Sequence, residues 1–103
     1  RLHQRSEDRA IAWQQLGDIY RRLERFDEAV EAYQQARGLD PAFAWPYHNL
    51  GLIYEQQGDY EAAAPLFRQA IARHKNDRDR VLSWQRLGDV CHALNRYTEA
   101  IED

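Results

Sequence analysis

The four histidines and the single cysteine are the side chains of this sequence best suited to binding a transition metal. They are His3, His48, His74, His92 and Cys91. No two of the histidines are four residues apart, and Cys91 and His92 are adjacent, so they point to different sides of a helix. The spacing therefore argues against a metal site, and we expect no cofactor.

Nucleophilic catalysis has equally little support in the sequence. The only serine and threonine hydroxyls belong to Ser6, Ser83 and Thr98. None of the three has a histidine and an acid in an evident triad arrangement. Each glycine has a structural explanation in the pattern described below, so no phosphate-binding loop remains. We therefore predict a protein that is not an enzyme.

The composition of the chain limits the number of domains and the kinds of partner that we expect. A chain of 103 residues with 44% hydrophobic content forms one compact domain, and no apolar run is long enough for a membrane span. The net charge of −3 disfavours nonspecific binding to nucleic acid, whose affinity comes mainly from neutralising phosphates. One cysteine gives no disulfide framework, so nothing indicates an oxidising compartment. We expect a cytoplasmic protein that binds neither nucleic acid nor membrane.

The elements that position these residues are set by an internal repeat. An aromatic residue, Leu-Gly and a second aromatic or apolar residue recur with the same internal spacing, 34 and then 37 residues apart. The three copies are Trp13-Leu16-Gly17-Tyr20, Tyr47-Leu50-Gly51-Tyr54 and Trp84-Leu87-Gly88-Cys91. Because Cys91 replaces an aromatic residue of the motif, we expect a buried, reduced thiol there. Repeats this short cannot bury a core alone and must stack.

Each repeat reads as two amphipathic helices joined by a polar turn. Trp13, Leu16 and Tyr20 share one helical face, and Ala29, Tyr33 and Ala36 share another further along. The motif glycines Gly17, Gly51 and Gly88 lie in helix interiors, where glycine costs roughly 1 kcal/mol relative to alanine. We expect that cost to be offset by close approach of the second helix, with Gly17 against a helix presenting Ala29.

Turn residues separate the two helices of each repeat at matching places. The turns are expected at residues 25–27, 58–60 and 95–97, with Asp27 and Asp59 capping the helices that follow. Gly38 is expected to end a helix in the left-handed conformation. The additional three residues of the longer spacing fall within residues 73–80, where Asn76 or Asp77 can cap the next helix.

This pattern closely resembles the tetratricopeptide repeat over about residues 10–103. The second half of the motif supports the resemblance, through Ala29-Tyr33-Ala36-Pro41, then Ala63-Phe67-Ala70, and finally Ala100. The resemblance implies an all-α, right-handed superhelical solenoid of antiparallel helix pairs. We expect residues 1–9 to be the end of a preceding repeat or the start of an extended first helix. Repeat 1 then spans 10–43, repeat 2 spans 44–80 with the three-residue insertion, and a partial repeat 3 spans 81–103.

The same resemblance implies a concave groove lined by the first helix of each repeat. Helical faces not used for packing supply its candidate residues, a mixture of hydrogen-bonding groups, charges and apolar anchors. They are Ile11, Gln14, Asp18 and Arg21 in the first repeat; Trp45, His48, Asn49, Leu52 and Glu55 in the second; and Leu82, Gln85, Arg86, Asp89 and His92 in the third. Trp45 is the first choice as a ligand anchor, although it could instead pack on Phe43 and the neighbouring prolines.

The sequence therefore predicts a module that binds a protein or peptide of unknown identity. Members of the family that act as co-chaperones clamp a C-terminal carboxylate, but only Asn49 and Arg86 match that clamp here, and Asp18 would repel the carboxylate. The alternative is a structural spacer or regulatory arm of a larger multidomain signalling protein or enzyme, with no ligand in its own groove. A small-molecule or metal sensor is a third interpretation. Residues 3–32 match 74–103 at thirteen positions, which indicates a piece of a longer array. An uncovered last helix would then allow self-association through the C-terminal end.

Overall fold

Five helices and no strand make up residues 2–102 of the computed structural model, which describes backbone over that range and side chains over residues 5–96. The helices are α1 (Leu2–Arg22), α2 (Phe26–Leu39), α3 (Ala44–Gln56), α4 (Tyr60–Arg73) and α5 (Asp77–Glu102). The chain is elongated, with extents of 57 × 30 × 19 Å. None of these helices is both long and apolar enough to cross a membrane. The predicted all-α class is confirmed.

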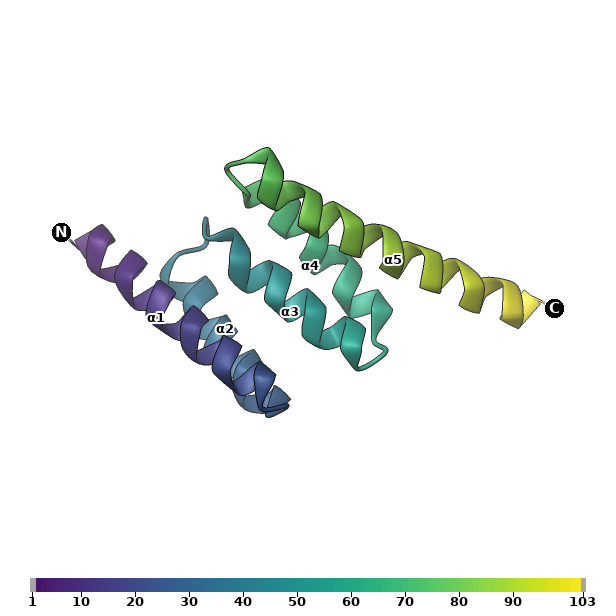
Figure 1. The fold of residues 1–103 in the computed structure, drawn as a ribbon, viewed down its shortest axis with the longest axis horizontal. Coiled ribbons are helices and arrows are strands. Elements are labelled where there is room, and N and C mark those ends of the chain that lie inside the picture. The colour runs from purple at the N-terminus through teal and green to yellow at the C-terminus, as the bar shows by residue number, and fades with distance from the viewer. Residues whose placement is uncertain (1, 103) are drawn as a thin grey trace.

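Consecutive helices form antiparallel hairpins that stack into a solenoid (Figure 1). Helices α1, α3 and α5 lie in one layer, with α2 and α4 behind them. Helix α2 packs on α1, and α4 packs on both α3 and α5. The two termini lie at opposite ends of the stack. Each repeat therefore contributes its first helix to the same face of the molecule.

An aromatic ring lying on a glycine holds each of the first two hairpins together. A Cβ added to Gly17 would lie 2.6 Å from the Tyr33 ring, and one added to Gly51 would lie 2.8 Å from the Phe67 ring. Both rings are fully buried. The predicted close approach is confirmed at these two positions, although the group that contacts the glycine is the ring rather than Ala29.

Two apolar clusters form the core along the stack. The first lies between the two hairpins and contains Ala29, Tyr33, Tyr47, Leu50, Ile53, Leu66 and Ala70. The second joins α4 to α5 and contains Ala63, Ala64, Phe67, Leu87 and Val90. Small alanines in α2 and α4 allow the helices to approach closely enough for the large rings to interdigitate. The core is thus continuous from one repeat to the next.

Charged and polar contacts fix the junction between the first and second hairpins. The Pro41 carbonyl accepts hydrogen bonds from the Tyr47 hydroxyl at 2.9 Å and from Arg73 Nε at 2.8 Å. The guanidinium groups of Arg37 and Arg73 lie 4.6 and 4.2 Å from the centroid of the Tyr47 ring. Cation–π contacts of this kind contribute about 0.5–1 kcal/mol each at partly exposed sites. Tyr47 therefore connects α2, α3 and α4.

The structure confirms only some of the helix caps that the sequence predicted. Asp59 accepts a hydrogen bond from the Ala62 amide, and Asn76 accepts one from the Asp79 amide at 2.8 Å, so both predicted caps are confirmed. Asp27 lies inside α2, which begins at Phe26 without a side-chain cap, so that prediction is wrong. Gly38 is also helical, because α2 continues to Leu39 and only Glu24 and Gly58 have positive φ in the described chain.

The third repeat departs most from the prediction. No turn occurs at residues 95–97, because α5 continues as one helix of 26 residues. Within residues 2–102 no second helix covers α5 as α2 covers α1, so Trp84 is 55% exposed and nothing lies within 4 Å of a Cβ placed on Gly88. Cys91 is exposed rather than buried. The expected close approach at Gly88 and the expected buried thiol are therefore both wrong.

These glycines should respond oppositely to substitution by alanine. Gly51→Ala should lower the free energy of unfolding by about 1–2 kcal/mol, because overpacking against the Phe67 ring outweighs the better helix propensity of alanine. Gly88→Ala meets no neighbouring atom and should raise the free energy of unfolding by up to about 1 kcal/mol. Urea unfolding followed by circular dichroism measures both changes, and equal effects would contradict the ring-on-glycine packing.

Candidate functional site

An open hollow of about 560 Å³ lies between α3 and α5 on the layer formed by the first helices. Leu52 and Leu82 supply apolar surface, and Leu82 is 44% exposed. We call this hollow the α3–α5 groove. Six residues line it, and all six belong to the predicted set: His48, Leu52, Leu82, Gln85, Arg86 and Asp89. The period of the repeat was therefore enough to predict that these six side chains share one surface.

The groove carries charges of both signs. Arg86 lies 3.7 Å from the carboxylate of Glu55 on α3, and the Arg86 side chain remains 49% exposed. Burial raises the pKa of Glu55, with nearby Asp89 acting in the same direction and Arg86 opposing them. Because Arg86 and Asp89 both keep donor or acceptor capacity toward solvent, the groove can bind groups of either charge beside its two leucines.

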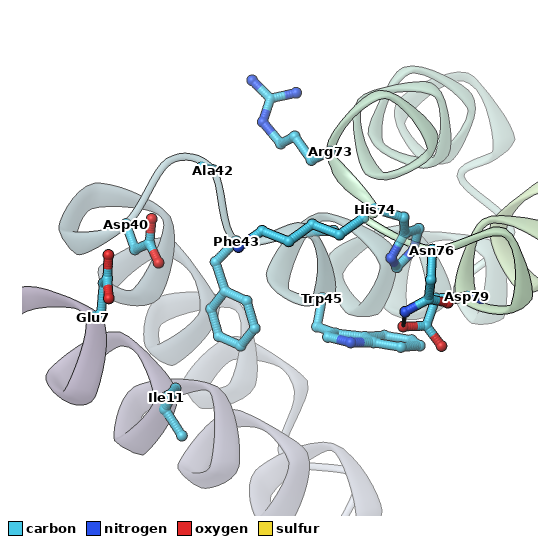
Figure 2. A pocket seen from close by; sticks show the side chains of 12 residues that line it. Glu7, Ile11, Asp40, Ala42, Phe43, Trp45, Arg73, His74, Asn76 and Asp79 are labelled. Atoms are coloured by element: carbon cyan, nitrogen blue, oxygen red, sulfur yellow. Dashed lines mark hydrogen bonds between the residues drawn. The ribbon is translucent and has the colours of Figure 1, made fainter. Parts of the chain in front are cut away.

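A second hollow of about 380 Å³ lies next to the N-terminal end of α3 and contains Trp45 (Figure 2). The rings of Phe43 and Trp45 point into it, with Ile11 of α1 on one side and Asp79 of α5 on the other. We call it the Trp45 hollow. Its other lining residues are Glu7, Asp40, Ala42, Ala44, Arg73, His74, Lys75 and Asn76. The Trp45 hollow combines apolar rings with charges of both signs.

Trp45 is half-buried and packs on two histidine rings. Its ring meets those of His48 and His74 edge-on, with centroids 5.4 and 4.8 Å apart. The packing partners are thus histidines, and Phe43 shares the hollow with the indole. Trp45 therefore packs at the repeat junction, and its indole is partly exposed in the Trp45 hollow.

A fully buried serine joins these two histidines. Ser83 Oγ lies 2.8 Å from His48 Nδ1 and 2.9 Å from His74 Nε2. Its hydroxyl can donate to one imidazole and accept from the other, which requires at least one neutral ring. Burial, with the charges of His74, Arg86 and Arg21 acting in the same direction, lowers the pKa of His48 to about 4. Burial also lowers the pKa of His74.

The His48–Ser83–His74 chain is a structural link rather than a nucleophile. Ser83 has no accessible surface, so no substrate carbonyl can reach its hydroxyl. Sequence reasoning missed the link, because it treated His48 as a groove residue and Ser83 as an isolated hydroxyl. The one available signal was the separation of 35 residues between His48 and Ser83, close to the repeat period.

Four predicted groove residues instead lie together where α1, α2 and α3 meet. Asp18 accepts hydrogen bonds from the Tyr33 hydroxyl at 2.5 Å and from Asn49 Nδ2 at 3.2 Å. Arg21 Nε donates to the Tyr33 hydroxyl at 3.3 Å. Burial and the bond to Asp18 raise the pKa of Tyr33. Gln14 is buried beside them, and its Oε1 has no hydrogen-bond partner within the described part of the chain.

The last predicted residue, His92, is exposed on α5 and lines neither hollow. Within residues 5–96, no group of three histidine, cysteine or acidic side chains is placed to hold a metal ion.

Comparison with known proteins identifies the family. A family model described as TPR repeat matches residues 17–58, and one described as tetratricopeptide repeat matches residues 43–103, more than half of the chain. The chain belongs to the tetratricopeptide repeat family. Members of this family generally act as protein-binding modules without catalytic activity. The hairpins seen here are thus tetratricopeptide repeats, and the molecule is a protein–protein interaction module in general terms.

Several curated proteins are similar to this tetratricopeptide repeat chain. A TPR repeat-containing protein of Methanocaldococcus jannaschii is 28% identical over 92 residues, which is 89% of this chain and 16% of the relative. The peroxisomal targeting signal receptor of Saccharomyces cerevisiae is 26% identical over 88% of this chain and 14% of the receptor. The human cell division cycle protein 16 homolog is 32% identical over 60% of this chain and 10% of the relative. The chain therefore spans less than a fifth of these relatives.

The geometry also bears on the carboxylate clamp of co-chaperone tetratricopeptide repeats. Of the two matching residues, Asn49 is only 6% exposed and donates its amide to Asp18. Arg86 is paired with Glu55. Asn49 is therefore not free to meet a carboxylate in the way the clamp requires, and of the two matching residues only Arg86 keeps exposed donors.

Proposed function

We propose that this chain binds a peptide segment of another protein in the α3–α5 groove. The observation that carries the proposal is the convergence there of two apolar anchors, Leu52 and Leu82, with Gln85, Arg86 and Asp89 at their edge. An extended peptide or a short helix presents apolar side chains beside backbone and charged groups, which is the chemistry this surface complements.

The character of the groove also indicates which peptides it favours. Leu52 and Leu82 suit one aliphatic or aromatic side chain of the ligand, because burying it against them removes apolar surface from water. Arg86 and Asp89, of opposite sign, suit a neighbouring polar or mixed-charge residue rather than a run of one charge. The relatives named as receptors for a peroxisomal targeting signal support the idea that a repeat of this kind recognises a peptide segment.

Catalysis is not part of the proposal. Ser83, the serine linked to two histidines, is buried, and the groove side chains bind and orient rather than activate a nucleophile. We propose that the chain acts by holding its partner.

The groove is tested with peptides selected from a random library on the immobilised 103-residue chain. An enriched peptide, labelled with fluorescein, should bind the chain in solution by fluorescence anisotropy. Leu82→Glu should weaken that binding at least tenfold, because it removes an apolar contact worth about 1 kcal/mol and adds a carboxylate to the buried contact.

The neighbouring Val81→Glu provides a matched control. Val81 is 49% exposed, close to the 44% of Leu82, but it does not line the α3–α5 groove. It should leave the affinity within about twofold of the unmodified chain, as surface substitutions away from a contact usually do. Equal loss with both variants, or no enriched peptide at all, would contradict binding in the groove and favour the spacer interpretation.

A further inference from the structure

The Trp45 hollow has two aromatic rings with which a positively charged group can interact. Its volume of about 380 Å³ falls within the range of small-ligand pockets. The rings of Phe43 and Trp45 point into it, and both side chains are partly exposed. Because the face of an aromatic ring carries partial negative charge, it attracts a cation, and arginine stacks on such rings more often than lysine does.

Three carboxylates surround these rings. Glu7 of α1 and Asp40 lie on the Phe43 side of the hollow, and Asp79 of α5 lies on the Trp45 side (Figure 2). Asp79 accepts a hydrogen bond from the neighbouring Asn76. Within residues 5–96, neither Glu7 nor Asp40 forms an ion pair. Their oxygens therefore keep their acceptor capacity for a ligand.

The positive charges around the hollow are fewer and are partly committed elsewhere. Arg73 points away from the two rings (Figure 2), donates to the Pro41 carbonyl and lies over the ring of Tyr47. His74 is neutral near pH 7, because burial lowers its pKa. Among the described lining residues, Lys75 is the remaining cation, and it is exposed. One uncommitted ammonium thus faces three carboxylates, which favours a cationic ligand.

The Trp45 hollow is continuous with the α3–α5 groove. His48 lines the groove, and its ring meets that of Trp45 edge-on. On α5, Asp79 lines the hollow and Leu82, about one turn later, lines the groove. Gln85, in the middle of the groove-lining part of α5, is six residues or about 9 Å from Asp79. An extended peptide covers about 3.3 Å per residue, so roughly three residues span this separation.

We propose that the Trp45 hollow binds an arginine or lysine side chain of the same partner segment whose apolar residue lies between Leu52 and Leu82. This inference rests on the proposed function and adds a charge and a spacing to it. The cation stacks on the two rings, and its N–H groups donate to Glu7 and Asp40. The basic residue lies about three residues from the apolar one. Arginine fits better than lysine, because its planar guanidinium stacks and donates at the same time.

The charge of the ligand is tested with a library peptide that binds the groove. Three versions carry arginine, lysine or citrulline three residues from the apolar residue, and citrulline keeps the shape of arginine without its charge. By fluorescence anisotropy, the arginine version should bind at least about fivefold more tightly than the citrulline version, with lysine between them. About 0.5 M NaCl should reduce this preference, because salt screens exposed charges.

A double variant tests the two carboxylates. Glu7→Gln with Asp40→Asn should bring the arginine and citrulline peptides to within about twofold of each other, because both acceptor charges are lost. Asp8→Asn with Glu31→Gln removes the same two charges from exposed residues that line neither hollow, and should keep the full preference. The preference compares two peptides on one protein, so a partly unfolded variant would weaken both equally and leave it unchanged.

Two single variants should move the preference in opposite directions. Trp45→Leu should lower it by about two- to fivefold, because the cation loses the indole. Lys75→Gln should raise it by about twofold, because it removes the ammonium that opposes the ligand at the hollow. Equal affinity for the arginine and citrulline peptides, or a preference that survives the change of Glu7 and Asp40, would overturn the proposal while the groove still stands.

A smaller probe decides the matter if no peptide is enriched on the chain. N-acetyl-arginine methylamide carries the cation without an apolar anchor, so it does not need the groove. It should shift the Trp45 indole N–H resonance of the ¹⁵N-labelled 103-residue chain with a Kd on the order of 10 mM, and Leu82→Glu should leave that shift unchanged. No shift, or the same shift with N-acetyl-citrulline methylamide, would overturn the cation site.

Discussion

Replacing Phe67 with alanine should lower the free energy of unfolding by about 3–5 kcal/mol. The Phe67 ring is fully buried, lies on Gly51 of α3 and belongs to the cluster that joins α4 to Leu87 and Val90 of α5. Alanine would leave a cavity between three helices, and the solenoid would lose the contact that connects its second hairpin to α5. Urea unfolding monitored by circular dichroism measures the loss.

Two variants calibrate this result. Phe26→Ala removes a half-buried ring at the start of α2 and should cost about 1–2 kcal/mol, because less apolar surface is returned to water. Phe67→Leu keeps most of the volume and should fall between the two alanine variants. A loss below about 1 kcal/mol for Phe67→Ala would mean that α4 and α5 are held together by something other than this ring.

Acid should destabilise the fold by about 2 kcal/mol at pH 5 and about 3 kcal/mol at pH 4 through His48 alone. The pKa of His48 is about 4 in the folded chain, against an ordinary value of 6.5. The unfolded state therefore binds a proton first as the pH falls. The stabilisation is fully present above pH 6.5 and is lost between pH 6.5 and pH 4. The lowered pKa of His74 acts in the same direction.

The comparison with His48→Asn isolates this effect from other acidic groups. Glu55, whose pKa is raised in the folded chain, contributes with the opposite sign and is unchanged between the two proteins. The loss of stability between pH 7 and pH 5 should be about 2 kcal/mol smaller in His48→Asn. His92→Gln, an exposed histidine on α5, is the matched control and should retain the full loss. Parallel pH profiles for all three proteins would exclude His48 as the cause.

The hairpins were predictable because their packing is local. Gly17 and Tyr33, like Gly51 and Phe67, are sixteen residues apart, so one motif contains both the space and the ring that fills it. The third motif has no such pair among these residues, because the position sixteen residues after Gly88 is 104. The turn expected at residues 95–97 rested on the motif alone, and α5 runs through those residues as one helix.

The groove was predictable only in outline. A period of 34 to 37 residues places Leu52 and Leu82 on neighbouring helices, whatever the side-chain details. It does not fix the small rotations that decide which polar groups meet. Asn49 therefore turned toward Asp18 and became buried, although the sequence placed it in the groove. The bridge from His48 through Ser83 depends on hydroxyl placement within about 3 Å, which no periodicity specifies.

The two junctions of the stack differ in how they respond to protons. The first junction is held by the guanidinium groups of Arg37 and Arg73 on the Tyr47 ring, whereas the bridge through Ser83 depends on neutral imidazole. Acid should therefore weaken the attachment of α5 to the second hairpin more than the contact between the first two hairpins. The helices would then separate in a fixed order that begins with α5, although the repeats are similar in sequence.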